Sequence, residues 1–382
     1  MKKNSKLAML LAAAFIMPTA FVACSDDDDN NDNNSAKETA LAQVNKQFIE
    51  NTAIATYKKL ADDCELLQNY VENLSSQNSL KNACDQWKTA RQDWEWSEAF
   101  LFGAASGYSI DPHIDTWPFD VTVFNSYMAK FDLTQEADQA IIDHNVATTQ
   151  NFTGFHAMEY VIFRDGEPRQ FTDLTANELY FIKAVAADLY LSACRLEAAW
   201  AGIDNVKAAR QQLLEEEELE PEDNFGNEMI NAGKAGSRWA SATDAAIQII
   251  AGCQDIIGEV ADSKIGSAYT GADKNYIESP HAYNSIQDFY DNIMSCKHAL
   301  YGGLDNNSKT PAAGSLMLYC DTYFPTKATA AKEALENALE KIAAMKRPFV
   351  LNYTDDSCGA AIEALHQLDE ALDGLSKALE EQ

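Results

Sequence analysis

The stretch SLKNACDQWKTARQDWEWSEAFLF at residues 79–102 decides the fold class. It contains no glycine or proline, and its apolar residues recur at intervals of four and three, which is the spacing of one face of an α-helix. The stripe consists of Leu80, Cys84, Trp87, Arg91, Trp94, Glu98 and Leu101. Two members, Arg91 and Glu98, are charged, and an unpaired charge on a buried face is costly. We therefore expect a buried helix whose charges either pair with another helix or line a polar site.

The same helical spacing extends over most of the chain. It covers residues 40–74, 134–149, 152–163, 175–200, 206–219, 225–260, 285–301, 315–323, 327–345 and 360–379. Sustained alternation of apolar and polar residues, the pattern of a half-buried strand, is missing from the sequence. An acidic stretch with one proline, residues 215–224, interrupts the pattern near the middle. The sequence predicts an all-α protein of two packed helical bundles, residues 38–218 and 225–382.

The N-terminus has the organisation of a secretory signal. Three lysines in the first six residues precede an apolar run at residues 7–17, which is too short to span a bilayer. The run leads to FVAC at residues 21–24, which resembles a bacterial lipobox, with Phe21 where leucine is usual. We predict a signal peptide at residues 1–23 and lipidation of Cys24.

Residues 24–37 follow as a predicted acidic tether. The sequence SDDDDNNDNN at residues 25–34 resembles the tag that sends some Gram-negative lipoproteins to the outer face of the outer membrane. Such a run is solvated in any location. We predict an outer-membrane lipoprotein exposed at the cell surface, with a periplasm-facing lipoprotein as the alternative.

Composition narrows the classes of partner. The 382 residues include 59 acidic and 29 basic side chains, a formal net charge of −30. Such a surface repels phosphate backbones, so we expect no nucleic-acid partner and favour cations. Apart from Cys24, seven cysteines remain of the eight, and none forms a Cys-x-x-Cys pair. The sequence leaves open whether two of them form a disulfide.

The segment GFHAMEYVIF at residues 154–163 places two polar side chains in apolar surroundings. On a helix, His156 and Glu159 lie side by side one turn apart, whereas on a strand they would point to opposite faces. As neighbours they could bind one cation, or the carboxylate could orient the imidazole. Two ligands fall short of a zinc site, and the His-Glu-x-x-His arrangement of zinc peptidases is missing from the sequence.

The segment at residues 154–163 resembles the signature of the imelysin-like family. A second resemblance to that family lies at residues 94–103 and 114–118, which include Glu98 and Asp115. Further blocks match the family in order, namely residues 264–266, 278–280, 284–285, 291–293, 301–303 and 347–349. The resemblance covers nearly all of the mature chain.

The resemblance implies two helical bundles, export, and an association with iron-uptake systems. It implies that His156 and Glu159 form a metal or functional site near the contact between the domains, with Glu98 and Asp115 as further candidates. The family commonly has an aromatic residue, serine and histidine after its Glu-Ser-Pro, whereas this chain has His281, Ala282 and Tyr283.

Three hypotheses follow. The first is a binding protein for a metal ion, an iron complex or haem, working with iron-transport proteins, with metal ligands among His156, Glu159, Glu98 and Asp115. The second is a metallopeptidase, with His156 as a ligand and Glu159 or Glu98 as general base. The third is a non-catalytic interaction module, in which the polar pair only fixes helix register.

Overall fold

The computed structural model describes residues 29–382, with side chains from residue 35 onward. The predicted signal peptide and the lipidation site at Cys24 lie outside the described residues. Within that range the chain is all-α, as predicted, apart from the two-residue antiparallel strands β1 (Phe163–Arg164) and β2 (Glu167–Pro168). None of the helices described has the length and hydrophobicity needed to cross a membrane.

The long helices follow the predicted ranges, whereas α4, α5, α6, α13 and α17 lie outside them. In chain order they are α1 (Asp29–Phe48), α2 (Ile54–Glu72), α3 (Gln77–Glu95), α4 (Ala104–Gly107), α5 (Asp111–Ile114), α6 (Val121–Met128), α7 (Glu136–Thr148), α8 (Gly154–Ile162), α9 (Ala176–Ala201), α10 (Ala208–Glu216), α11 (Phe225–Ile230), α12 (Ala242–Gly258), α13 (Gly266–Tyr269), α14 (Ser285–Tyr301), α15 (Leu316–Tyr323), α16 (Pro325–Ala343), α17 (Phe349–Asn352) and α18 (Asp356–Glu380). π-helical turns at Ile49–Ala53 and Glu259–Ile265 extend helices, and 3₁₀ turns lie at Glu98–Phe100, Phe171–Asp173 and Ile203–Asn205.

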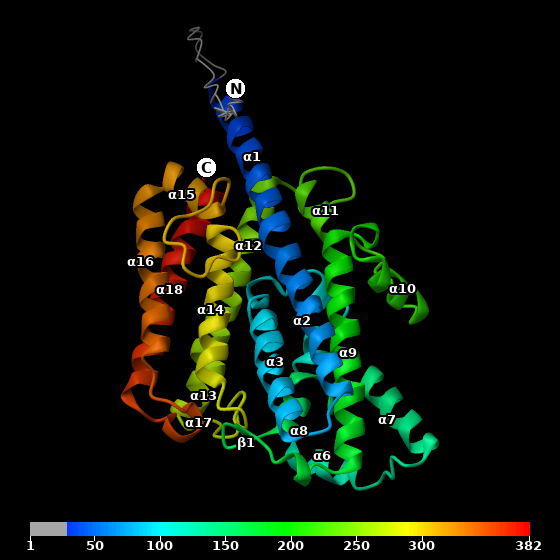
Figure 1. The fold of residues 1–382 in the computed structure, drawn as a ribbon. Helices are drawn as coiled ribbons and strands as arrows, with labels where there is room; N and C mark the ends of the chain where they lie inside the picture. The colour runs from blue at the N-terminus through cyan, green and yellow to red at the C-terminus, as the bar shows by residue number, and fades with distance from the viewer. Residues whose placement is uncertain (1–28) are drawn as a thin grey trace, which may run out of the picture.

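Two groups of long helices stand side by side (Figure 1). Helices α2, α3 and α9 pack together in one group, and α12, α14, α16 and α18 in the other. Helix α1 continues into α2 through a π-helical turn, and α1 itself packs on α12 and α15. The division into bundles 38–218 and 225–382 stays a prediction.

Side-chain caps define where the helices begin. Ser76 caps α3 in a reciprocal capping box with Ser79, and Thr175 does the same for α9 with Glu178. These boxes satisfy backbone N–H groups that the first helical turn leaves free. Local sequence and tertiary packing therefore agree at both helix starts.

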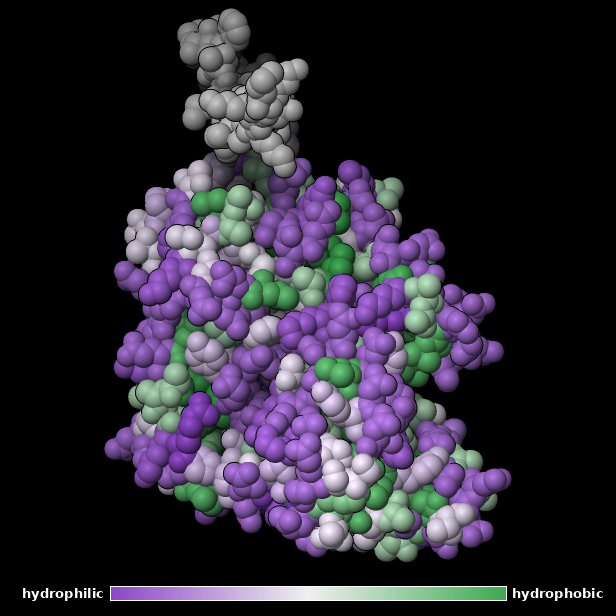
Figure 2. Space-filling model, viewed as in Figure 1, coloured by the Kyte–Doolittle hydropathy of each residue, from purple (hydrophilic) through white to green (hydrophobic). Residues whose placement is uncertain are grey.

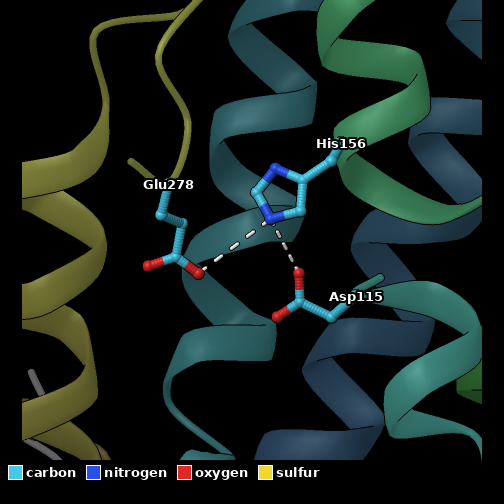
Figure 3. A group of neighbouring side chains, drawn as sticks. All are labelled: Asp115, His156 and Glu278. Carbon is cyan, nitrogen blue, oxygen red and sulfur yellow. Dashed lines mark ion pairs between the residues drawn. The ribbon is translucent and has the colours of Figure 1, made fainter. Parts of the chain in front are cut away.

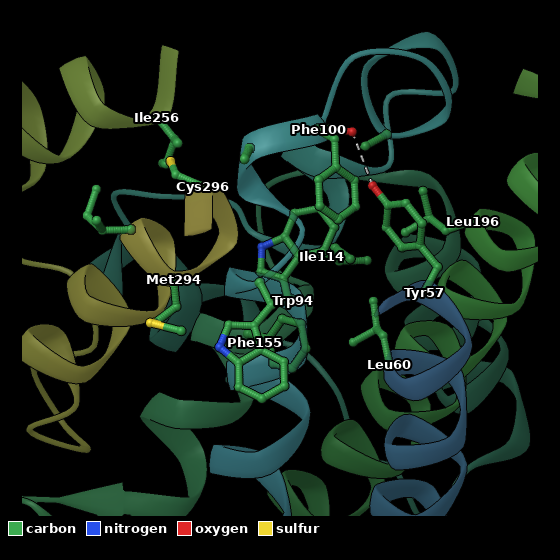
Figure 4. Packing of buried hydrophobic residues seen from close by; sticks show 14 of the residues in the cluster. Tyr57, Leu60, Trp94, Phe100, Ile114, Phe155, Leu196, Ile256, Met294 and Cys296 are labelled. Atoms are coloured by element: carbon green, nitrogen blue, oxygen red, sulfur yellow. Dashed lines mark hydrogen bonds between the residues drawn. The ribbon is translucent and has the colours of Figure 1, made fainter. Parts of the chain in front are cut away.

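Aromatic side chains fill the core between α2, α3 and α9 (Figure 4). The rings of Tyr57 and Phe100 meet edge to face at 5.5 Å, and the Tyr57 hydroxyl donates to the Phe100 carbonyl at 3.4 Å. Trp200 lies against both rings. All seven described cysteines are buried and free, so no disulfide joins the described helices.

Two predicted helices are shorter in the structure. The helix predicted at residues 79–102 ends at Glu95, where the Ser97 hydroxyl donates to the Trp94 carbonyl at 2.7 Å and competes with the helical ladder. Glu98 therefore lies on a 3₁₀ turn. The helix predicted at 225–260 is interrupted between α11 and α12, where Gly233 and Gly236 have positive φ.

A glycine lets the two groups of helices approach closely at this 3₁₀ turn. A Cβ atom on Gly252 of α12 would lie 2.1 Å from the Ala99 carbonyl oxygen. Only glycine permits that contact without moving one backbone. The segment that carries Glu98 is thereby pressed onto α12.

The visible outer surface is largely hydrophilic (Figure 2). Large exposed hydrophobic side chains of the described region are dispersed over α2, α6, α7, α15 and α17; they are Leu66, Val123, Ile141, Leu318, Tyr323 and Leu351. Scattered residues of this kind are ordinary on a folded protein. The unusual charges of this chain are the buried ones.

Candidate functional site

Three side chains from distant parts of the sequence converge in the interior (Figure 3). His156 lies on α8, Asp115 directly follows α5, and Glu278 lies in the segment before α14. The His156 Nε2 atom is 3.0 Å from Asp115 Oδ1 and 4.0 Å from Glu278 Oε1. One potential ligand atom from each residue lies within 4.8 Å of the other two. All three side chains are buried or nearly so.

Gly154 brings Asp115 and His156 together. It has a φ of +77°, and a Cβ atom there would lie 2.1 Å from the carbonyl oxygen of Ile114. The start of α8 can therefore touch the end of α5 only if residue 154 is glycine. The Trp87 indole also donates to the Phe155 carbonyl at 3.1 Å, which fixes the start of α8 against α3.

Glu159 lies on the opposite side of the imidazole from Asp115. Its Oε2 atom is 3.2 Å from His156 Nδ1, and its Oε1 atom accepts the backbone N–H groups of His281 and Ala282 at 2.7 and 2.8 Å. Glu159 thus orients His156 and holds the segment that follows Glu278. A carboxylate on the second ring nitrogen is the usual support for a metal-binding histidine.

The segment after Glu278 is held in an uncommon backbone conformation. Ser279 and Tyr283 have φ values of 44° and 54°, in the left-handed region. The Gly166 N–H, in the turn between β1 and β2, donates to the His281 carbonyl at 2.9 Å. The contacts of this stretch with Glu159 use backbone N–H groups, which many residue types supply.

Two buried cations share these carboxylates. Arg91 pairs with Glu278 at 2.7 Å and contacts Asp115 and Glu95. Lys264, on the π-helical turn after α12, lies 3.1 Å from Glu278. The network joins α3 to the segments on either side of α13.

Carboxylates outnumber these cations. Six lie together in the interior: Glu95, Glu98, Asp115, Glu159, Glu278 and Asp288. Among them, Glu278 Oε2 and Asp288 Oδ2 are buried and accept no hydrogen bond from the described residues. The interior therefore contains more carboxyl groups than Arg91 and Lys264 can pair with.

The pKa values of these buried groups reflect their burial and the charges of their neighbours. Burial raises the pKa values of Glu95 and Glu98 well above their usual range and that of Asp288 to about 7. Burial and the charge of Arg91 lower the pKa of His156, but hydrogen bonds to Asp115 and Glu159 outweigh them and raise it to about 9. Burial also acts to raise the pKa of Asp115, but Arg91 and His156 hold it well below its usual range. The interior favours bound protons or another cation.

Two cavities meet at this cluster. The larger, about 610 Å³, is lined by His156, Glu159 and His281 together with aromatic and polar residues. The smaller, about 330 Å³, is lined by Asp115 and Glu278 together with further acidic residues. Trp117 lines both cavities, and its ring centroid is 4.6 Å from that of His156.

The structure brings some predicted site residues together and separates others. His156 and Asp115 are in direct contact, while Glu159 touches only the far nitrogen of the imidazole. Glu98 lies outside the group of three and lines the smaller cavity with Asp115. Sequence reasoning missed Glu278 as a site residue, although it begins the Glu-Ser-Pro block.

The donor set suits a transition metal. One imidazole nitrogen and two carboxylates are ligands that iron, zinc and manganese accept. Two ligands that each lie about 2.1 Å from one ion can be at most about 4.2 Å apart, and both distances from His156 Nε2 satisfy this limit. The unpartnered Glu278 Oε2 offers a further free donor atom.

The family is shown by comparison with known proteins. The family model described as imelysin matches residues 53–379. The chain belongs to the imelysin family. This imelysin-family chain is 25% identical over 314 residues to iron-regulated protein A of Synechococcus elongatus, covering 81% of this chain and 77% of that protein.

Two solved structures are similar to this imelysin-family chain. A crystal structure of an iron-regulated protein A precursor from Parabacteroides distasonis superposes with a TM-score of 0.76 and 26% identity, covering 90% of this chain and 95% of that one. An imelysin-like protein from Psychrobacter arcticum gives a TM-score of 0.57 at 14% identity, covering 88% of this chain and 93% of that one. The second likeness concerns the fold alone.

Proposed function

We propose that this chain is an exported lipoprotein that binds a metal ion, with iron the first candidate, through Asp115, His156 and Glu278. The observation that carries the proposal is the convergence of these three donors in an interior rich in carboxyl groups. A cation bound there would offset repulsion between carboxylates, which is strong where water is scarce.

The surrounding contacts support a metal site that is held by protein side chains on one side and faces a cavity, with room for exchangeable ligands, on the other. Glu159 fixes the ring of His156 through Nδ1 and leaves Nε2 directed at Asp115. The larger cavity, which His156 lines, has room for water or for organic ligands of a metal complex. Iron is favoured because the donors suit it and because the relatives in Synechococcus and Parabacteroides are called iron-regulated.

The peptidase alternative receives less support from the geometry. A general base needs a free lone pair directed at the attacking water. Glu159 instead contacts His156 with one oxygen and accepts two backbone N–H groups with the other. Glu98, the other candidate base, lies outside the group of three possible ligands.

Calorimetric titration of metal-stripped protein with Fe²⁺ without oxygen, and separately with Zn²⁺, tests the proposed site. We expect saturable binding near one equivalent, which His156→Ala and Glu278→Gln each abolish or weaken strongly. His366→Ala is the matched control. This surface histidine pairs with Asp262, at 3.0 Å, and is not one of the proposed ligands. If both site variants bind as the wild type does, or if the wild type binds neither ion, the network is an ion-pair cluster without a metal role.

Export and anchoring are a separate part of the proposal. The signal-like residues 1–23, Cys24 and the acidic run behind it support an outer-membrane lipoprotein that faces outward. The iron-regulated names of the relatives support a role beside iron-transport proteins. We expect Cys24→Ala to lose labelling by a fatty-acid probe and to leave the membrane fraction. Protease treatment of intact cells distinguishes a surface-exposed protein, which is digested, from a periplasm-facing one.

A further inference from the structure

A third cavity lies on the far side of α5 from the carboxylate cluster. It measures about 390 Å³ and lies between α9, the end of α7, and the loops before α5 and after α10. His113 of α5 lines it, whereas Asp111 and Asp115 line the smaller acidic cavity. The volume suits a small-molecule ligand.

Arg195 supplies this cavity with a positive charge that pairs with none of the described carboxylates. Its guanidinium lies 4.3 Å from the centre of the Tyr108 ring, and its Nε atom is buried with no hydrogen-bond partner among the described residues. Ion pairs formed by the described side chains do not include Arg195. Four of the seven arginines, Arg91, Arg169, Arg210 and Arg238, do form such pairs.

The other charged groups of the cavity are paired with each other or exposed to solvent. His113 and Asp188 form a pair, with Nε2 and Oδ2 at 2.8 Å, and Asp188 also accepts the Thr153 hydroxyl at 3.1 Å. Glu217 lines the cavity and is exposed, and it forms no ion pair with Arg195.

The polar groups beside Arg195 are arranged along one face of α9. Asp188, Ser192 and Arg195 follow one another at intervals of four and three residues, so they share that face. Ser192 is 8% exposed and lines the cavity, and Ser109 adds a second hydroxyl from the loop before α5. Hydroxyl donors beside a guanidinium are a common setting for oxyanion recognition.

We propose that this cavity binds a small oxyanion, a carboxylate or a phosphate, with Arg195 as its principal contact and the hydroxyls of Ser109 and Ser192 as further donors. The planar guanidinium offers two parallel N–H groups to such an anion, and its stacking on the Tyr108 ring restricts the orientation of the Arg195 side chain. Because the protein as a whole is acidic, binding must come from these local contacts rather than from long-range attraction.

Titration of the purified protein with inorganic phosphate, and separately with succinate, tests the proposal and distinguishes the two kinds of oxyanion. We expect at least one of them to bind saturably near one equivalent and to raise the melting temperature. Arg195→Gln should weaken that binding about tenfold or more, since a charge-assisted bidentate contact is lost. Arg195→Lys keeps the positive charge but loses the planar pair of N–H donors, so its anion affinity should lie between those of the wild type and Arg195→Gln.

Arg238→Gln is the matched control. Arg238 also stacks on an aromatic ring, Phe225 at 4.1 Å, but its guanidinium already pairs with Glu228 at 2.8 Å. This variant should bind the anion as the wild type does, and so should His156→Ala, because the metal site is separate. The proposal is wrong if neither anion binds in the millimolar range, or if folded Arg195→Gln and Arg195→Lys both bind with wild-type affinity.

Discussion

The contact between Gly154 and Ile114 allows a sharp test of how the site is built. In Gly154→Ala the new Cβ atom would lie 2.1 Å from the Ile114 carbonyl oxygen, at a residue with a φ of +77°. Two costs therefore add. A non-glycine residue in the left-handed region costs about 1–2 kcal/mol. Moving the end of α5 away from the methyl group adds about 1–3 kcal/mol of overpacking.

A second glycine separates these two costs. Gly271 has the same φ of +77°, but a Cβ atom there would meet nothing within 4 Å. Gly271→Ala should therefore lose only the backbone term, about 1–2 kcal/mol. Urea denaturation of the two variants gives the contact term as the difference between their free energies of unfolding.

The same displacement reaches the proposed metal site. Asp115 follows Ile114 directly, so relieving the clash moves its carboxylate from His156 Nε2, now 3.0 Å away. We expect Gly154→Ala to weaken metal binding strongly and Gly271→Ala to leave it unchanged. If the two variants have equal free energies of unfolding and Gly154→Ala binds metal as the wild type does, this account of the contact between α5 and α8 is wrong.

Three further predictions concern buried charges. Glu159→Gln places an amide donor beside His156 Nδ1–H or beside the two backbone N–H groups, so metal affinity should fall about 10–100-fold in calorimetry while circular dichroism shows a folded protein. Arg91→Met removes the cation shared by several buried carboxylates and should cost about 3–5 kcal/mol in urea denaturation, whereas an exposed-pair variant, Lys81→Met, should change stability little. His298 has its pKa lowered by burial to about 4 from 6.5, so the unfolded chain binds the extra proton first and stability should fall as the pH drops from 6.5 to 4. A His298→Gln variant should show a flatter melting temperature across that range, and an unchanged slope would contradict the assignment.

Local patterns in the sequence were sufficient to predict the long helices, but not the short ones such as α6. The four-and-three spacing of residues 79–102 led to α3, and capping residues such as Thr175 mark helix starts within a residue or two. The errors have local causes that the pattern does not contain. Ser97 ends α3 through a side-chain hydrogen bond, so Glu98 leaves the stripe, and two glycines at positive φ divide the helix predicted at 225–260.

The site was predictable only in part, because its members come from different elements. The spacing of His156 and Glu159 on one helix showed that they are neighbours, but not that they face different partners. Glu278 lies 122 residues beyond His156 in a segment with left-handed residues, where helical periodicity carries no information. Its approach depends on the backbone contacts that His281 and Ala282 make with Glu159, which no residue pattern reveals.

The carboxylate cluster also connects segments that lie far apart in the sequence. Asp115, His156 and Arg91 come from the part before α9, whereas Glu278 and Lys264 come from the part after α12. Glu278 is therefore held across these parts by its contact with Arg91 at 2.7 Å, and within its own part by Lys264 at 3.1 Å. A cation that binds all three proposed ligands would add a further link across the same contact. Because a ligand stabilises the state that binds it, metal affinity and the docking of these segments should rise and fall together. Variants that loosen the contact far from the ligands, such as Gly252→Ala at the Ala99 carbonyl, should then weaken metal binding without altering any donor atom.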